Sequence, residues 1–487
     1  MKTRVEKDAI GRFQVPSHAY YGIFTARALK NFQLTGIHAP RVFIKALGLI
    51  KEACAEVNMD LGLLDKKLCR AIMHAAHEFS EGKFDEYFPI DVIQAGAGTP
   101  FNMNANEIIA NRANELLEKP FGSYDPIHPN NHVNLSQSSN DVIPTAIRVS
   151  TLLALSSLLP ALEKLTWAFR DLSQKYASLV KVGRTHLEDA VPITLGQEFH
   201  TYVTMLTKAK KRIMAASEEL LELGLGGTAL GTGITTHPNY QKKVVAKLGK
   251  LCRLPLNPTD DMCETTSSAN VFVLISNAMR MLAIDFVKIA NDLKLLNMGP
   301  LAGLSEITLP EVEPGSSIMP GKVNPSVAEA VQMAAYHVMG ADHAIAQGAQ
   351  AGQLELNVMT PLIMHNLLSS ISLFTNTCEM FRKDCVEGIV VNENVIKGLF
   401  EKSLVTATAL SPYIGYEVTA ELVKEALSTN KSIVYVLRQK RFIEENDLRK
   451  ILSADKTTKP AMIDLPLKNK IQKHEEFLKF KSSLKQI

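Results

Sequence analysis

The chain has 487 residues, 46% of them hydrophobic, so it is long enough for more than one domain and a large buried core. Lysine and arginine total 53 against 50 aspartate and glutamate, a formal net charge of +3, which gives no electrostatic footprint for nucleic acid or an anionic membrane. These totals favour a soluble globular protein whose partner is a small molecule.

The N-terminal end lacks the apolar core of a signal peptide, and we expect no membrane-spanning run later, so the sequence predicts a cytoplasmic protein. The cysteines form no CxxC pair and no cluster with histidine, which favours buried free thiols over a disulfide framework or a structural metal. They are Cys54, Cys69, Cys252, Cys263, Cys378 and Cys385.

The first part of the chain predicts a small helical domain with an irregular start, because a helical apolar pattern runs from Leu47 to Leu61. A glycine-rich run over residues 94–100 then leads into alternating asparagines. Since asparagine bonds the backbone outside helices, we expect a loop through Asn106 that feeds a helix, or residues that only punctuate turns. The GAG in this run follows no strand and lacks the GxGxxG spacing, so it is not a dinucleotide-binding fingerprint.

A second polar loop runs from His128 towards Asp141, before Pro144, which we expect to open a long apolar helix kinked at Pro160. Hydroxyl and amide side chains at such a helix start form either an N-cap cluster or a binding site, and taken alone they favour the N-cap. These side chains belong to Ser138, Ser139 and Asn140.

A third polar loop, residues 183–189, carries Thr185 and His186, and a histidine in such a loop more often caps or packs than catalyses. The glycine-rich segment 223–233 places small residues where backbones approach closely. Long helical patterns follow over 267–297, 327–347 and 362–386. They predict a bundle of long helices whose apolar faces are buried against other copies of the chain.

The stretch Gly315–Pro325 contains two glycines and two prolines, so it forms a shaped loop. We expect Asn324 to cap the helix that begins near Pro325. Backbone N–H groups at a helix start, together with the ammonium of Lys322, favour a carboxylate or phosphate guest. The alternative is a surface turn with a solvated lysine.

From about Val391 the pattern changes to short capped helices, which suggests a small C-terminal domain. The lysine-rich tail after Lys456 predicts a frayed or surface-docked end. The sequence therefore predicts a mostly α protein in three parts: an N-terminal helical domain over 1–140, a central long-helix bundle over 141–392, and a small C-terminal helical domain over 393–487.

Four polar loops precede helices and carry hydroxyls, amides, imidazoles and one ammonium, with few carboxylates. Pooled, they predict a site for a ligand with more than one negative charge, most simply a dicarboxylic acid.

Five segments strongly resemble the aspartase/fumarase superfamily, in order and over nearly the whole chain: AGAGTPFNMNANE, VNLSQSSND, GRTHLEDAVP, GGTALGTG and GSSIMPGKVNP. The resemblance implies three mostly helical domains, a homotetramer assembled through the bundle, and active sites built from three subunits. It also implies removal of a proton to give an aci-carboxylate, which expels ammonia, water or an amine and leaves fumarate.

By this resemblance, Ser316 is the catalytic base, activated by backbone amides and a nearby cation. Lys322 and Asn324 would bind the α-carboxylate. Aligned hydroxyl donors would hold the carboxylate next to the departing proton, namely Thr99, Ser138, Ser139 and Ser317.

The resemblance also gives groups that contact the α-carboxylate or the leaving group: Thr185, His186 and Asn140. Glu329 resembles the acid that orients this histidine. His128 and Asn130 lie in a segment that forms a second anion site in some fumarases.

The motifs divide between two members of the superfamily. The runs at 20–22, 93–99, 352–359 and 458–460 look like aspartate ammonia-lyases, whereas those at 128–130, 138–141, 236–238 and 313–315 look like class II fumarases. Aspartases usually have threonine where Ser139 stands, and Pro100 departs from both patterns.

We favour reversible deamination of L-aspartate, because both chain ends are on the aspartase side. The alternatives are hydration of fumarate and a non-catalytic structural relative. No cofactor is expected; Mg²⁺ activates some aspartases, but no ligand cluster places it here.

Overall fold

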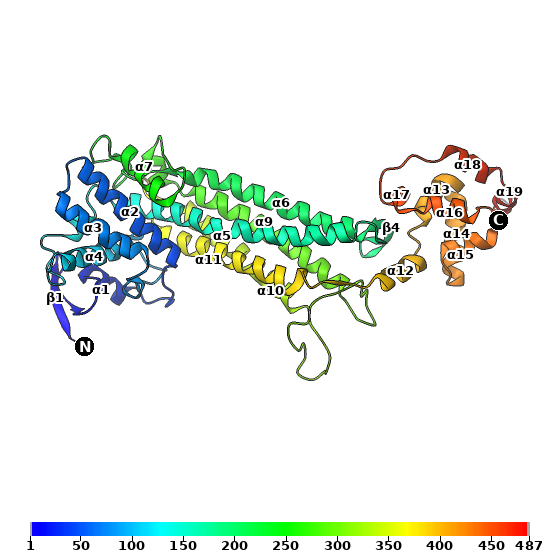
Figure 1. The fold of residues 1–487 in the computed structure, drawn as a ribbon, viewed down its shortest axis with the longest axis horizontal. Coiled ribbons are helices and arrows are strands. Elements are labelled where there is room, and N and C mark those ends of the chain that lie inside the picture. The colour runs from blue at the N-terminus through cyan, green and yellow to red at the C-terminus, as the bar shows by residue number, and fades with distance from the viewer. Residues whose placement is uncertain (1, 485–487) are drawn as a thin grey trace. The chain divides into compact units, whose positions relative to one another are not determined.

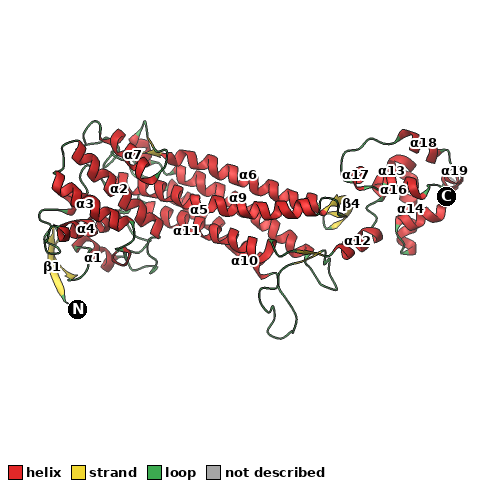
Figure 2. Ribbon diagram, in the orientation of Figure 1, coloured by secondary structure: helices red, strands yellow, loops and turns green. Residues whose placement is uncertain are grey.

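The computed structural model describes residues 2–484 and is mostly helical, as predicted (Figures 1 and 2). Residues 1 and 485–487, the outer ends of the predicted terminal domains, lie outside the described residues. The chain forms two compact units, described separately below. The first contains residues up to 162, 208–287 and 331–378, and the second contains 163–207, 288–330 and 379 onward. The three-domain boundaries stay a prediction.

The first unit begins with an antiparallel hairpin and a group of helices. Its elements are β1 (Thr3–Asp8), β2 (Gly11–Pro16), α1 (Ile23–Asn31), α2 (Arg41–Asp60), α3 (Lys66–Ser80), η1 (Asp85–Tyr87), α4 (Thr99–Leu116) and the π-helical turn η2 (Pro129–Val133). The predicted apolar face of α2 is confirmed from Leu47 to Val57, since Leu47, Ile50, Ala53 and Val57 are buried, and α2 packs on α3. Leu61, the last residue of the predicted pattern, lies just beyond the helix and is part-buried.

Helix α4 begins at Thr99, so the predicted loop through Asn106 is wrong. The asparagines of its first turns are buried, and their amides bond other segments, such as Asn104 to the carbonyl of Tyr87 at 3.0 Å. Because these partners occupy the side chains, the asparagines do not compete with the helix backbone. Pro100 lies in the first turn, where a missing N–H costs no helical bond.

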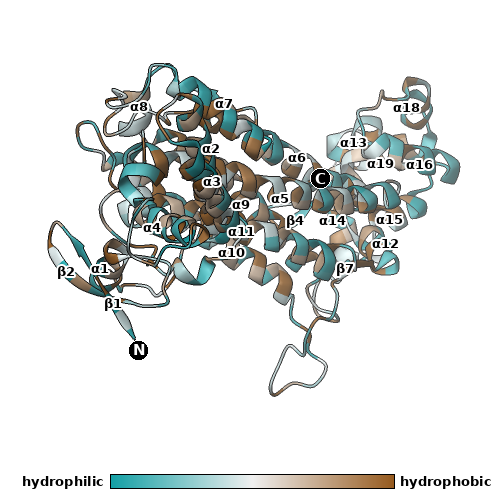
Figure 3. Ribbon diagram, turned by 60° about the vertical axis from the view of Figure 1, so that its left-hand side comes forward, coloured by the Kyte–Doolittle hydropathy of each residue, from teal (hydrophilic) through white to brown (hydrophobic). Residues whose placement is uncertain are grey.

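Five long helices carry the predicted bundle (Figure 1): α5 (Ser139–Lys175), α6 (Leu195–Glu218), α9 (Asn270–Leu296), α10 (Ser326–Gln350) and α11 (Thr360–Phe381). They carry many hydrophobic residues (Figure 3). In the first unit, α9 contacts α10 through Ser276 and Asp342 (2.6 Å) and α11 through the Phe286 and Phe374 rings (5.2 Å between centroids). In the second unit, the ring of Phe169 on α5 contacts Tyr202 on α6 and Phe381.

The start of α5 differs from the prediction. The helix begins at Ser139 rather than at Pro144, and it continues through both Pro144 and Pro160. The remaining elements of the first unit are η3 (Glu219–Leu221), β5 (Glu222–Leu223) paired in parallel with β6 (Asn257–Pro258), α7 (Tyr240–Cys252) and α8 (Met262–Ser267).

In the second unit, the predicted polar loop at 183–189 is instead part of an antiparallel hairpin. Strands β3 (Val180–Thr185) and β4 (Glu188–Thr194) are joined by His186 and Leu187, whose φ angles are +58° and +62°. Positive φ at both turn residues is the geometry of a tight hairpin turn. A further short pair joins β7 (Ile307–Thr308) to β8 (Val390–Val391).

The C-terminal part of the second unit consists of short helices, as predicted. After η4 (Arg382–Val386) they are α12 (Glu393–Lys402), α13 (Ala407–Ile414), α14 (Tyr416–Thr429), α15 (Ile433–Lys440), α16 (Glu445–Ile451), α17 (Ala454–Thr457), α18 (Leu465–Gln472) and α19 (Glu475–Ser483). They share a core of their own, into which the tail packs Leu467, Ile471 and Phe477. Up to residue 484 the tail is therefore docked rather than frayed.

All described cysteines are unpaired, and all but Cys263 are buried, close to the predicted pattern. Two helices, α5 and α9, are long and apolar enough to cross a membrane by length and composition. The most apolar 18-residue windows of α5 and α9 are 67% and 50% buried within the protein.

Candidate functional site

A cavity of about 520 Å³ in the first unit brings together three of the predicted hydroxyl residues, Thr99, Ser138 and Ser139. We call it the hydroxyl cavity. Thr99 is the first residue of α4 and Ser139 the first of α5, so two helix N-termini meet at its wall. The partial positive charge of helix N-termini favours an anion there.

The hydroxyl oxygens of both serines in the cavity accept hydrogen bonds from the protein. Ser139 Oγ accepts a hydrogen bond from Asn102 Nδ2 (3.0 Å), and Ser138 Oγ accepts one from the backbone N–H of Asn140 (3.3 Å). A hydroxyl that accepts from the protein keeps its own hydrogen to donate. Both serines can therefore donate to a bound carboxylate, while Ser138 also caps α5, as the N-cap alternative stated.

A buried lysine supports this wall. Lys51 Nζ donates to Asn102 Oδ1 (2.6 Å), to Gln137 Oε1 (2.7 Å) and to Asn134 Oδ1 (3.1 Å). Asn102 and Asn106 also donate to Asn134 Oδ1. Complete burial lowers the pKa of Lys51 to about 7. The network fixes Asn102, and through it Ser139.

Asp141 joins the start of α5 to the glycine-rich segment 223–233. Its Oδ1 accepts from the backbone N–H of Ser138 (2.9 Å), and its Oδ2 accepts from those of Gly226 and Thr228 (3.0 Å each). Burial raises the pKa of Asp141 to about 6 against these three donors. Asn140 Nδ2 donates to the carbonyl of Ala229 (2.7 Å), which leaves the acceptor oxygen of that amide turned away from the segment.

Another carboxyl, Glu107 of α4, lines the hydroxyl cavity and is fully buried. It accepts from the backbone N–H groups of Gly22, Phe24 and Thr25 at 2.8–3.1 Å, so it holds the start of α1. Burial raises the pKa of Glu107 to about 7, although these donors oppose the shift. Protonation of Glu107 would remove a negative charge from the cavity wall.

His128 and Asn130 lie on the same cavity wall. The Nδ1 of His128 accepts from the backbone N–H of Asn130 (3.1 Å), so this ring caps η2. Burial lowers the pKa of His128, which favours a neutral imidazole. Whether these residues form a second anion site stays a prediction.

The predicted base lies in the second unit, in the loop at 315–325. The neck of this loop is closed by Gly315, whose N–H donates to the carbonyl of Lys322 (2.8 Å) and whose carbonyl accepts from Asn324 Nδ2 (2.6 Å). Helix α10 begins at Ser326, so Pro325 directly precedes it. The amide nitrogen of Asn324 closes the loop, and capping by its side-chain oxygen stays a prediction.

Within this loop Ser316 Oγ accepts hydrogen bonds from the backbone N–H groups of Ile318 (3.3 Å) and Met319 (3.0 Å). Two N–H dipoles aimed at one oxygen stabilise negative charge on it. Ser317 and Lys322 are exposed on the same loop. The loop therefore holds a hydroxyl suited to ionise and a cation free to meet a ligand.

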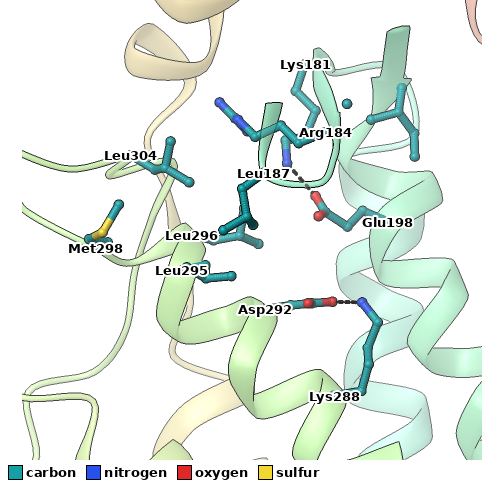
Figure 4. Close-up of a pocket in the computed structure, with 12 residues that line it drawn as sticks. Lys181, Arg184, Leu187, Glu198, Lys288, Asp292, Leu295, Leu296, Met298 and Leu304 are labelled. Atoms are coloured by element: carbon teal, nitrogen blue, oxygen red, sulfur yellow. Dashed lines mark hydrogen bonds and ion pairs between the residues drawn. The ribbon is translucent and has the colours of Figure 1, made fainter. Parts of the chain in front are cut away.

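The hairpin at 180–194 places Thr185 and His186 at its exposed tip, also in the second unit. A pocket of about 310 Å³ lies beside the hairpin, where Lys181, Arg184 and Leu187 face the end of α9 (Figure 4). Lys181 Nζ lies 2.6 Å from Glu198 Oε2, and Lys288 pairs with Asp292 in the same pocket.

The predicted site residues thus fall into two groups. Thr99, Ser138, Ser139 and Asn140 belong to the first unit, and the others to the second. Among residues 2–484, His186 and Glu329 share no hydrogen bond or ion pair, and Glu329 is exposed on α10. The orienting role of Glu329 stays a prediction. No group of three or more His, Cys, Asp or Glu side chains in the described part could hold a metal ion.

Sequence reasoning missed the buried charges that hold these groups: Lys51, Glu107, Asp141, Lys181 and Glu306. For Lys51 a signal exists, because it falls on the apolar face of α2, between Leu47 and Cys54 at helical spacing. A charged residue in a buried stripe needs a polar partner, and the asparagine-rich segment supplies it.

Comparison with known proteins finds relatives of both kinds to which the motifs point. A profile of the family described as lyase matches residues 11–340, and one described as fumarase C C-terminus matches residues 406–459. The aspartate ammonia-lyase of Pseudomonas aeruginosa is 44% identical over 467 residues, covering 95% of this chain and 98% of that protein. A class II fumarate hydratase of Nitrosomonas europaea is 46% identical over 424 residues, covering 87% and 92%.

A solved structure agrees with the fold. The fumarate lyase:delta crystallin from Brucella melitensis, bound to cobalt, superposes with a TM-score of 0.90 at 41% identity, and the match covers 93% of this chain and 98% of that chain.

Proposed function

Since the chain belongs to the lyase family that matches residues 11–340, we propose that it deaminates L-aspartate reversibly to fumarate and ammonia. The observation that carries the chemistry is the geometry at Ser316, whose oxygen accepts two backbone N–H groups inside a closed loop. Likeness to aspartate ammonia-lyases over nearly the full chain favours aspartate as the substrate.

The reaction begins with removal of a proton from C3 of L-aspartate by the ionised oxygen of Ser316. The electron pair of the broken C–H bond moves into the neighbouring carboxylate and gives an aci-carboxylate dianion. The C2–N bond then breaks, its electrons leave with ammonia, and the double bond of fumarate forms between C2 and C3. Loss of the Ser316 proton to solvent resets the base.

The dianion needs donors that are already in place. Thr99, Ser138 and Ser139 line one cavity at two helix N-termini, and Ser317 would join them from the loop. Preorganised donors in a partly enclosed site act more strongly than water on developing charge. On the other side of the substrate, Lys322 and Asn324 would bind the α-carboxylate.

The leaving ammonia would be held by Thr185, His186 and Asn140. The amide nitrogen of Asn140 is occupied by the carbonyl of Ala229, so its oxygen is the group offered to a ligand. An ammonium carries only donors, which suits an acceptor oxygen. Glu329 would orient His186.

We propose that these groups come from different subunits of a homotetramer, as the resemblance to the aspartase/fumarase superfamily implies. Exposed apolar side chains on α9 and α10 support self-association. The proposal includes a cytoplasmic location and needs no cofactor.

Fumarate hydratase is the second candidate. The 46% identity to a class II fumarate hydratase and the serine at position 139 favour it. The two candidates share the aci-carboxylate and differ only in the leaving group.

The experiment supplies purified protein with L-aspartate or with L-malate and follows fumarate by absorbance. Fumarate from L-aspartate, with at most a trace from L-malate, supports the proposal. Turnover of L-malate alone would replace it with the hydratase, and turnover of neither would favour a non-catalytic relative.

A further inference from the structure

The buried carboxylate of Glu306 contacts two cations of the hairpin at 180–194. Arg184 Nη1 lies 2.8 Å from Oε1, and Lys181 Nζ lies 2.7 Å from Oε2. The side chain of Glu306 has no exposed surface, and that of Lys181 is 3% exposed. Figure 4 shows both cations extending from the hairpin, with Glu198 of α6 as a second partner of Lys181. Each oxygen of Glu306 therefore holds a different point of strand β3.

The backbone of Glu306 is fixed as well. Its N–H donates to the carbonyl of Leu296 (2.9 Å), and its carbonyl accepts from the N–H of Asn392 (3.0 Å). The next two residues form β7, and the N–H of Leu309 then bonds Asn297 Oδ1 (2.9 Å). From there only a short segment leads to Gly315, the neck of the loop that carries Ser316.

Stability alone does not explain this arrangement. Removing charges from water is costly, and well-packed apolar residues usually stabilise a core as well as a buried ion pair does. A carboxylate held by two cations also fixes an orientation, because each of its oxygens contacts a different residue of strand β3. The hairpin tip begins one residue beyond Arg184.

We propose that Glu306 is a positioning residue of the reaction: it fixes the hairpin of Thr185 and His186 to the segment that sets the base of the Ser316 loop. The expected effect on kcat rests on the proposed function. The expected effect on the order of the hairpin and the loop does not. Glu306 itself touches no substrate.

The test compares Glu306→Gln with Glu198→Gln, which removes the more exposed carboxylate partner of Lys181 and leaves the contacts of Glu306 in place. Hydrogen exchange followed by mass spectrometry should show about tenfold faster exchange at residues 183–188 and 315–324 in Glu306→Gln, and wild-type exchange in Glu198→Gln. This readout does not depend on which substrate is turned over.

The kinetic arm measures kcat per folded enzyme, with circular dichroism to establish folding. We expect Glu306→Gln to lose about 10- to 100-fold in kcat with a smaller change in KM, because misplaced catalytic groups slow the chemical step. The isotope effect on kcat with C3-deuterated L-aspartate should rise. Arg184→Gln combined with Glu306→Gln should lose no more than Glu306→Gln alone, because Glu306→Gln already weakens the contact that Arg184 makes.

The inference is overturned if both glutamine variants behave alike in exchange, or if kcat per folded enzyme and the isotope effect stay at wild-type values. Failure of the proposed function would look different. Wild-type protein would then turn over L-malate or nothing, while the exchange comparison would still decide the role of Glu306.

Discussion

A serine hydroxyl is a very weak base, and the N–H groups of Ile318 and Met319 are the surroundings that would let Ser316 ionise. These donors come from the loop's own backbone. The same logic applies to Ser138 and Ser139, whose hydroxyls accept from the protein and can donate to a ligand. At the scale of single residues, the chemistry is set by hydrogen-bond direction.

Ser316→Ala should lower kcat by about 10²- to 10⁴-fold and leave ground-state binding of an unreactive dicarboxylate nearly unchanged, because the base acts on C3 alone. Steady-state kinetics and a binding titration check this. Ser428→Ala, on α14, is the control and should keep wild-type values. Equal kcat in Ser316→Ala and wild type would show that another residue is the base.

Glu107 predicts a pH dependence of stability. Its pKa is 4.5 in the unfolded chain and about 7 in the fold, because burial disfavours the charge. A raised pKa means that the contribution is fully present below pH 4.5 and is lost as the pH rises through about 7. The loss approaches about 3 kcal/mol, and urea unfolding between pH 5 and 8 measures it.

In Glu107→Gln this part of the pH dependence should disappear, since the amide does not titrate. The variant should also be less stable throughout, because its NH₂ group meets a backbone N–H. Glu118→Gln, an exposed residue just beyond the same helix, should keep the wild-type slope. The assignment fails if wild type and Glu107→Gln share one slope.

A site residue can be identified from the sequence when its own neighbours along the chain mark it as unusual. Hydroxyl, amide and ammonium groups stand out in glycine- and proline-rich loops, so Ser316, Lys322, Ser138 and His186 could be singled out. Asp141 and Glu306 could not, because an isolated carboxylate in sequence does not reveal which backbone N–H or cation will face it. Apart from the N–H of Ser138, the partners of these carboxylates lie 85 or more residues away and depend on the fold.

At the scale of elements, turn chemistry placed the loops but not their inner structure. Residues 315–325 form a loop, as predicted. Residues 183–189 belong to a hairpin instead, because His186 and Leu187 adopt positive φ angles that their residue types do not indicate. Helix α4 begins seven residues before the end of the expected loop, because tertiary partners hold its asparagines. Local propensity fails where long-range bonds replace local ones.

Gly315→Ala tests whether the loop neck positions Ser316. A Cβ at this residue would lie 2.6 Å from the nitrogen of Asn324 and 2.7 Å from the carbonyl oxygen of Lys322, so the neck must open. We expect kcat to fall about 10- to 100-fold with little change in the thermal midpoint. Gly398→Ala in α12, where a Cβ meets nothing within 4 Å, should keep full activity. Full activity in Gly315→Ala would show that the neck is not needed.

Asp141→Asn tests the joint between α5 and the segment 223–233. Both carboxylate oxygens accept backbone N–H groups, so the NH₂ of asparagine must face a donor and should cost about 1–3 kcal/mol in urea unfolding. Asp65→Asn is the matched control, because that exposed cap uses one oxygen and asparagine caps equally well. Equal stability of the two variants would contradict the assignment.

For the whole molecule, the sequence predicted a mostly helical chain with a long-helix bundle, and both are confirmed. The strong 3.6-residue apolar periodicity of long helices is what made this possible. Bundle residues that remain exposed include Ile284 (54%), Met333 (69%) and Tyr336 (56%). Large apolar side chains at helical spacing on an open face favour burial against further copies.

Sedimentation should therefore give a particle of four chains, and a monomer would contradict shared active sites. Mixing inactive Ser316→Ala with inactive His186→Ala under conditions that allow subunit exchange should restore part of the activity, because some sites then receive both intact residues. Wild type mixed with Ser316→Ala is the reference for exchange. No recovery despite exchange would place both residues in sites built from one subunit.

The most direct measurement of the central claim is the product balance from L-aspartate. Wild-type protein should release ammonia and fumarate in equal amounts, and Ser316→Ala should release neither at a comparable rate. Fumarate formed only from L-malate, or equal ammonia release by wild type and Ser316→Ala, would contradict the account.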